Sequence, residues 1–226
     1  MDNLLLKFSI MLVPGLMAIT CHEVSHGFIA DRFGDKTARM MGRLTLNPFK
    51  HLDILGTLML LVIKIGWAKP VPVNFNNLRH PKRDMIWVAA AGPVTNFLLA
   101  ILSAGLLRGI VALAAPLPDS AWQQMFIDPV VLMLAFSIYI NLLLAVFNLI
   151  PLPPLDGGRV AVGLLPYRQA AILSRIEPFG MILIILLVFF VDPFFAAISE
   201  IVNAGIVLLT GPQSRLVFSV LHFLMR

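Results

Sequence analysis

Charged side chains are scarce in this sequence. Asp, Glu, Lys and Arg make up only 13% of its 226 residues, whereas apolar residues make up 59%. A soluble domain usually carries about 25% charged residues. The chain therefore lacks the polar surface that would cover a water-soluble fold, and its composition predicts an all-α, polytopic integral membrane protein.

Cysteine is also scarce: Cys21 is the only one, so no disulfide can form within this sequence. Nor is there a basic and aromatic patch of the kind that binds nucleic acid, although the formal net charge is +5. The basic residues lie in short stretches between apolar runs, as is typical of loops at a membrane surface. We therefore expect a lipid bilayer, and no nucleic acid, among the partners.

Long apolar runs, by contrast, are frequent. A membrane-spanning helix needs roughly 20 mostly apolar residues. Five runs of about this length are present: 4–30, 85–115, 129–151, 179–198 and about 200–220. Pro193 should kink or end the fourth run. A shorter run at about 52–68 leads into a proline-rich segment, so we expect about five to six transmembrane helices with a re-entrant hairpin or a small membrane-associated β-segment.

The lysines and arginines between these runs orient the chain. The segments 31–50, 74–84 and 152–177 are basic, so we expect them on the cytoplasmic side of the cell (inner or plasma) membrane. The connection 116–128 has acidic residues and no Lys or Arg, and we expect it on the opposite side. Because 31–50 and 74–84 share a side, the run between them must enter and leave by one face, which is why a hairpin is predicted.

A polar cluster interrupts the first apolar run. His22-Glu23-Val24-Ser25-His26 is an HExxH sequence, and residues i and i+4 of a helix share a face, so both imidazoles can reach one metal ion. Glu23 can then touch a metal-bound water. The alternative is a polar helix end that reaches the interface. However, a charged group at membrane depth costs from about 2.5 to more than 10 kcal/mol, so packing explains such a cluster poorly.

A catalytic zinc site usually has a third protein ligand. Asp156 is the best candidate, because the prolines and glycines of 148–158 should unwind the chain around it. The positive-inside rule also places Asp156 and the two histidines near the cytoplasmic ends of their spans, which is an independent check. The alternative for Asp156 is a helix N-cap.

Four blocks of sequence carry a family resemblance. They are 22–27 (HEVSHG), 67–74 (WAKPVPVN), 91–96 (AGPVTN) and 148–159 (NLIPLPPLDGGR). With these blocks, in this order, the chain resembles the site-2 protease family of intramembrane zinc metalloproteases, and above all its short prokaryotic members. HExxH together with Leu-Asp-Gly is the specific signature, and the other two blocks support it.

The resemblance implies a metalloendopeptidase that holds Zn²⁺ (one per chain) and cleaves a transmembrane protein or peptide substrate near the cytoplasmic face. By position, His22, His26 and Asp156 match the zinc ligands and Glu23 the catalytic glutamate. Asn96 matches an asparagine close to the active site. Its amide N–H could stabilise an oxyanion or make an interhelical hydrogen bond, and both roles stay open.

Three further expectations follow. We expect 1–226 to form a single polytopic domain, with a catalytic core at about 4–160 and additional C-terminal helices at about 178–220. We expect 71–73 to pair with an unwound substrate as an added strand, although prolines also simply end helices. We expect interfacial or solvated roles for the remaining histidines: His51, His80 and His222.

Two other functions compete with the protease. An ion-binding membrane transporter usually shows related halves, but here the polar cluster occurs once. A catalytically inactive protease relative typically lacks a ligand or the glutamate, and here all four residues are present. The sequence leaves the natural substrate, the trigger for cleavage and the oligomeric state open.

Overall fold

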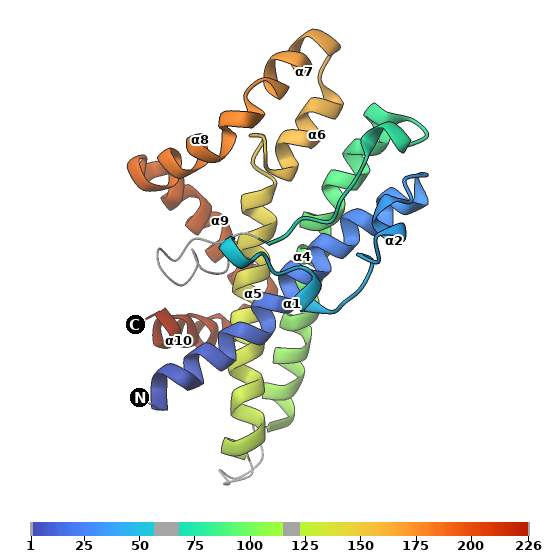
Figure 1. Cartoon of the computed structure of the whole chain (residues 1–226). Helices are drawn as coiled ribbons and strands as arrows, with labels where there is room; N and C mark the ends of the chain where they lie inside the picture. The colour runs from blue at the N-terminus through green and yellow to red at the C-terminus, as the bar shows by residue number, and fades with distance from the viewer. Residues whose placement is uncertain (1, 57–67, 115–122, 226) are drawn as a thin grey trace. The chain divides into compact units, whose positions relative to one another are not determined.

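The described part of the chain is helical. A computed structural model describes residues 2–56, 68–114 and 123–225, and every regular element within them is a helix or a helical turn (Figure 1). The helices are α1 (Asp2–Arg32), α2 (Thr37–Met40), α4 (Pro81–Ala114), α5 (Asp128–Asn148), α6 (Asp156–Leu164), α7 (Tyr167–Ser174), α8 (Glu177–Phe190), α9 (Asp192–Thr210) and α10 (Ser214–Met225). Short turns are η1 (Pro48–Lys50), η2 (Phe75–Asn77), η3 (Gln123–Ile127) and η4 (Gly211–Gln213).

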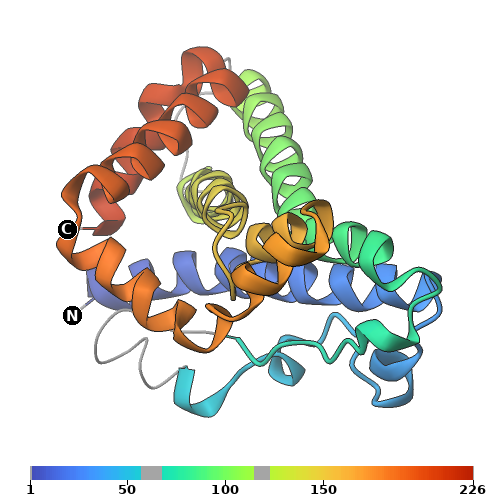
Figure 2. The same ribbon diagram turned by 90° about the horizontal axis from the view of Figure 1, so that it is seen from above.

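Several helices are long and apolar enough to cross a membrane, as the composition predicted. Among the described residues the candidates are Leu5–Arg32, Pro81–Ala114, Met125–Asn148 and Asp192–Leu224. The pair α7 and α8, bent by 65°, would make a fifth if it acts as one span (Figure 2). The prediction of an all-α membrane protein is confirmed. The predicted hairpin lies mostly at 57–67, outside the described residues.

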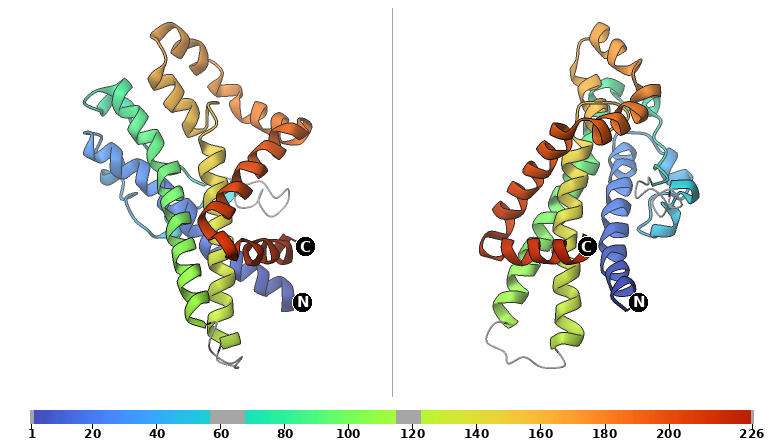
Figure 3. Two further views of the ribbon diagram at one scale, coloured as in Figure 1. Left: turned by 180° about the vertical axis from the view of Figure 1, so that it is seen from behind. Right: turned by 90° about the vertical axis from the view of Figure 1, so that its left-hand side faces the viewer.

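The C-terminal helices differ from the expected runs. The run predicted at 179–198 is wrong in its bounds, because α8 ends at Phe190 and α9 begins at Asp192. Pro193 explains this break: its ring has no N–H and would clash with the preceding turn of a continuous helix, but it fits the first turn of a new one. A second break follows at Gly211, whose φ of +57° turns the chain from α9 into α10 (Figure 3).

By its internal contacts the chain divides into two compact units. The first comprises Met1–Ala18, Asn96–Val146 and Phe195–Arg226, and its core holds side chains with almost no exposure: Ile10, Leu107, Ile138 and Ile206. The second comprises Ile19–Thr95 and Phe147–Phe194. Its apolar cluster is built on Ala30, Leu78 and Val88.

Within the second unit, α6 packs against the first turns of α4. Gly163 allows this, because a Cβ there would strike the side chain of Ile86. Lys82 adds polar contacts, since its ammonium donates to the carbonyl oxygen of Leu165 and lies 4.1 Å from the ring centroid of Tyr167. These contacts hold the end of α6, and the residues that follow it, against the start of α4.

Candidate metal centre

Helix α1 places two imidazoles side by side. The ring centroids of His22 and His26 lie 4.7 Å apart, as expected for residues one turn apart on one face. Nδ1 of His26 lies 2.7 Å from the carbonyl oxygen of Val88 on α4. Since a carbonyl only accepts hydrogen bonds, Nδ1 must carry the proton, which leaves the Nε2 lone pair to face a metal ion.

Asp156 is the first residue of α6. The N-cap position belongs to Leu155, and the helix start has no side-chain capping bond, so the alternative that Asp156 is an N-cap is wrong. The two glycines that follow let the chain double back closely: a Cβ on Gly157 or Gly158 would strike the backbone of 149–153. This tight turn explains why the segment contains glycines, and it leaves the carboxylate directed at the histidines rather than at its own helix.

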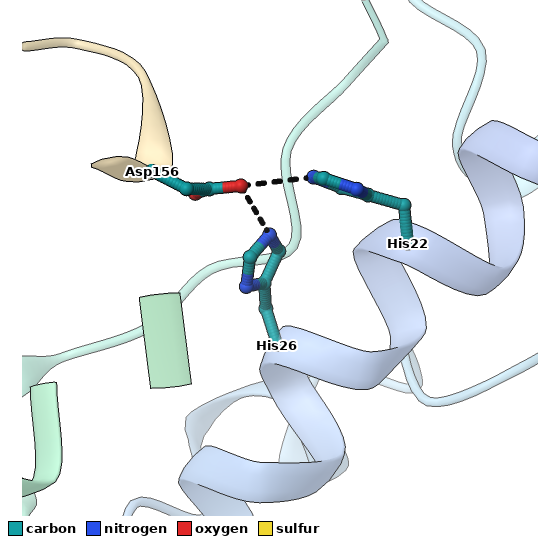
Figure 4. Close-up of side chains that lie close together, drawn as sticks. All are labelled: His22, His26 and Asp156. Carbon is teal, nitrogen blue, oxygen red and sulfur yellow. Dashed lines mark ion pairs between the residues drawn. The ribbon is translucent and has the colours of Figure 1, made fainter. Parts of the chain in front are cut away.

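The three side chains converge (Figure 4). Oδ2 of Asp156 lies 3.1 Å from Nε2 of His22 and 3.3 Å from Nε2 of His26. All three potential ligand atoms lie within 4.8 Å of one another. Two imidazoles and a carboxylate from separate segments, gathered in this way, are a ligand set that suits Zn²⁺.

The burial of the Asp156 carboxylate indicates that the site binds a cation. Asp156 is 8% exposed, and its buried Oδ2 has no hydrogen-bond partner in the described part of the chain. A buried, ionised oxygen without a hydrogen bond is costly, and coordination to a cation would satisfy it. The residues present therefore fit a zinc ion.

Gly92 on α4 leaves the space that this cluster occupies. A Cβ at Gly92 would lie 2.5 Å from Nε2 of His22 and 2.5 Å from Nε2 of His26. Gly92 lies in the motif block 91–96, but its sequence context alone did not indicate this role. The available signal was a glycine in the middle of an apolar helix, where its low helix propensity needs a packing reason.

Glu23 points to a different neighbour. Its side chain is half-buried, and Oε2 accepts a hydrogen bond of 2.8 Å from the backbone N–H of Val71. The segment around Val71 is the proline-rich block that the sequence singled out. The predicted general base is therefore in contact with this block, and its role as a base stays a prediction.

Asn96 belongs to the first unit, where it makes interhelical hydrogen bonds. Its fully buried Nδ2 donates to Oδ1 of Asn141 at 2.8 Å and to the carbonyl oxygen of Ala18 at 3.2 Å. This geometry matches the interhelical alternative. The oxyanion role remains a prediction.

The other histidines differ in how exposed they are. His80 and His222 are exposed, as expected. The expectation for His51 is wrong, because this side chain is 1% exposed and its Nε2 lies 2.8 Å from the carbonyl oxygen of Thr45. This burial depends on contacts that the fold brings about, and a local sequence pattern does not reveal them.

Comparison with known proteins gives an independent view of this chain. The model of peptidase family M50 matches residues 8–191. YwhC of Bacillus subtilis (strain 168), named as a proposed zinc metalloprotease, is 40% identical over 188 residues, which cover 81% of this chain and 80% of that protein.

Two mycobacterial relatives named Rip2, also proposed zinc metalloproteases, are more distant. The protein of Mycolicibacterium smegmatis is 31% identical over 185 residues, covering 80% of this chain and 66% of its own length. That of Mycobacterium tuberculosis (strain H37Rv) is 32% identical over 192 residues, covering 81% and 68%. No solved structure matches the chain significantly.

Proposed function

Because this chain belongs to peptidase family M50, the intramembrane zinc metalloproteases of the site-2 type, we propose that His22, His26 and Asp156 hold its zinc ion and that Glu23 is the general base. The observation that carries this proposal is the convergence of three ligand atoms within 4.8 Å, from segments far apart in the sequence. In the HExxH sequence Glu23 directly follows His22 on α1, so the proposed base lies next to a proposed zinc ligand.

The chemistry is hydrolysis of a peptide bond. When bound, zinc supplies a Lewis acid that activates a water molecule and polarises the scissile carbonyl. Glu23 would accept a proton from the attacking water as its oxygen forms a bond to the carbonyl carbon, and would deliver that proton to the leaving amine nitrogen as the C–N bond breaks. Since Oε2 of Glu23 accepts the Val71 N–H, Oε1 is the oxygen that remains to carry the proton.

The substrates are membrane proteins in a lipid bilayer. A transmembrane helix satisfies its own backbone hydrogen bonds, so the scissile segment must unwind before it can be cut. We propose that 71–73 pairs with the unwound segment as an added strand. We also propose that cleavage occurs near the cytoplasmic face of the cell membrane, which is the side on which the basic loops 31–50 and 74–84 should lie.

For the architecture we propose a single polytopic domain over 1–226, with five to six spans and a re-entrant hairpin between the first two. Among the described residues, four apolar helices are long enough to span a membrane, or five if α7 and α8 act as one span, so the lower end of this count is the better supported. The antiparallel bridge between Leu52 and Ala68, which flanks the hairpin segment, brings its two ends together as a hairpin requires.

The protein purified in detergent tests the assignment of Glu23. We expect Glu23→Gln to keep its zinc and lose cleavage of a model transmembrane substrate, because the amide fills the same space but cannot take a proton. Glu200→Gln, on an exposed position of α9, is the matched control and should cleave normally. Equal cleavage by Glu23→Gln and wild type would remove Glu23 from the mechanism.

A further inference from the structure

The non-helical segment 69–73, here called the strap, passes beside α1 (Figure 2). It contains Pro70 and Pro72, which have no backbone N–H. Between them, Val71 therefore carries the only N–H of residues 70–72, and it donates that N–H to Oε2 of Glu23. The sequence thus leaves one backbone donor at this point, and it is aimed at the proposed base.

The strap is also seated closely on α1. Gly27 lies one turn after Glu23 on the same helix face. A Cβ at Gly27 would lie 2.7 Å from Cγ1 of Val71 and 2.7 Å from Cδ2 of Leu44. The glycine therefore provides the seat for the Val71 side chain, which is only 6% exposed, while the Val71 amide reaches Glu23.

Arg43 holds the strap by its carbonyl groups. Its Nη2 donates to the carbonyl oxygen of Lys69 at 2.9 Å and to that of Pro70 at 3.3 Å. Arg43 is 9% exposed, and a guanidinium so deeply buried is stable only with such partners. These two carbonyl groups immediately precede the Val71 amide, so their position sets the position of the N–H that meets Glu23.

The backbone before Arg43 explains how it reaches the strap. Gly42 has φ of +62° and ends α2 in a Schellman motif, with its N–H on the carbonyl oxygen of Arg39 and the Arg43 N–H on that of Ala38. The ends of the segment are tied as well. The Lys69 N–H donates to the carbonyl oxygen of His51, and the Asn74 N–H donates to Oδ2 of Asp35.

We propose that Arg43 is a positioning residue of the protease, which acts through the strap to hold the carboxylate of Glu23. This inference rests on the proposed function, because it assigns a support to the proposed base. With Oε2 fixed by Val71, the carboxylate keeps the one orientation in which Oε1 can take the proton. Without Arg43 the strap moves, the carboxylate loses that orientation, and zinc binding is unaffected because Arg43 contacts no ligand.

The test compares Arg43→Gln with Arg168→Gln, which makes the same charge change on an exposed position of α7. Zinc content, kcat and KM would be measured on a model transmembrane substrate. We expect Arg43→Gln to lower kcat by about ten- to a hundredfold with zinc content unchanged, and to raise KM as well, because the residues proposed to pair with the substrate, 71–73, lie on the strap. Arg43→Lys should recover most of the rate, because both hydrogen bonds come from one nitrogen and one ammonium can make both.

Hydrogen exchange at the Val71 amide provides a readout that does not depend on activity. We expect this amide to exchange faster in Arg43→Gln than in wild type and Arg168→Gln. Val71→Pro removes the donor directly, so it should lower kcat to a similar extent while Arg43 is intact.

Unchanged kcat and unchanged Val71 protection in Arg43→Gln would overturn the inference. Loss of zinc in both Arg43→Gln and Val71→Pro would also overturn it, because the strap would then support the metal site and not the base. Glu23→Gln, measured in parallel, separates the two failures: normal cleavage by that variant refutes the proposed function itself, whatever the Arg43 variants do.

Discussion

Two buried polar clusters lie among the apolar helices, one in each unit, and they differ in how their hydrogen bonds are satisfied. In the first unit an amide cluster is closed on itself: Asn96 donates to Asn141, Asn141 donates to Ser137, and the Ser137 and Ser103 hydroxyls lie 2.9 Å apart. In the second unit Oδ2 of Asp156 faces two imidazole nitrogens and has no hydrogen bond within the described residues.

This difference separates a structural cluster from a reactive one. Polar groups in an apolar setting stabilise helix association when each donor meets an acceptor. An ionised oxygen that lacks a hydrogen bond costs free energy, and it persists when a cation supplies the missing interaction. Burial alone does not distinguish the two clusters, since both are buried and both bring helices together. The carboxylate oxygen of Asp156, which lacks a hydrogen bond within the described residues, does distinguish them.

The largest expected effect comes from removing that oxygen. We expect Asp156→Ala to lose bound zinc and cleavage together, with a fall in metal affinity beyond the roughly 10- to 100-fold typical of an outer-shell change. Zinc content by elemental analysis, followed by the cleavage assay, measures both. Asn141→Ala, in the amide cluster, is the counterpart and should keep its zinc. If Asp156→Ala bound zinc as wild type does, the distinction between the clusters would be wrong.

A second prediction changes the space around the metal cluster and none of its ligands. In Gly92→Ala the new methyl group would lie 2.5 Å from both imidazoles, so we expect zinc affinity to fall by about 10- to 100-fold. Competition with a chelator measures this. Gly109→Ala, in the same helix with no atom within 4 Å of the new Cβ, is the control and should bind zinc normally. Equal affinities in the two variants would show that the imidazoles can move aside.

A third prediction concerns Asp35, a carboxylate that already has hydrogen bonds within the protein. Asp35 is fully buried, and burial would raise its pKa, but hydrogen bonds from Thr37, Asn77 and the backbone of Asn74 outweigh burial and lower the pKa. The stabilisation that the ionised Asp35 carboxylate contributes is therefore fully present above the ordinary pKa of about 3.9. It is lost as the pH falls through the lower pKa that Asp35 has in the folded protein. We expect Asp35→Asn to lower Tm by a few degrees at pH 7 and by less in acid.

The zinc content of Asp35→Asn should not change, because this carboxylate, unlike Asp156, already has its hydrogen bonds within the protein. Thermal unfolding at several pH values, with zinc analysis of each sample, tests both statements. A destabilisation that is constant between pH 7 and pH 3 would contradict the assignment of the pH dependence to Asp35.

The smallest expected effect falls on the amide cluster itself. Interhelical hydrogen bonds in membrane proteins contribute about 0.6 kcal/mol on average. We expect Asn96→Ala and Asn141→Ala to destabilise the fold by a similar, modest amount, with zinc and kcat nearly unchanged. Unfolding in denaturing detergent, measured beside kcat, separates the two roles of Asn96. A large fall in kcat for Asn96→Ala alone would favour the oxyanion role.

The sequence predicted the parts of this picture that depend on local periodicity or on charge asymmetry. His22 and His26 share a helix face because they are four residues apart, and the apolar runs predict membrane spans from length alone. Asp156 lies far from both histidines in the sequence. The prolines and glycines of 148–158 made it the best candidate, and the basic loops, which predict the same membrane face for it and the histidines, were an independent check.

The features that were missed depend on neighbours brought together by the fold. The role of Gly92 is set by two rings from another helix, and that of Arg43 by carbonyl groups on the strap. Neither residue has a local pattern that indicates its partner. Pro193 shows an intermediate case: proline predicts a kink or a break, but only the packed structure selects the break at Val191.

Zinc K-edge X-ray absorption on the purified wild-type protein would identify the metal ligands without any substitution. We expect nitrogen and oxygen neighbours at about 2.0–2.2 Å, with outer-shell scattering from two imidazoles. A zinc ion without imidazole scattering, or with a sulfur neighbour at about 2.3 Å, would contradict the assignment of His22, His26 and Asp156 as its ligands.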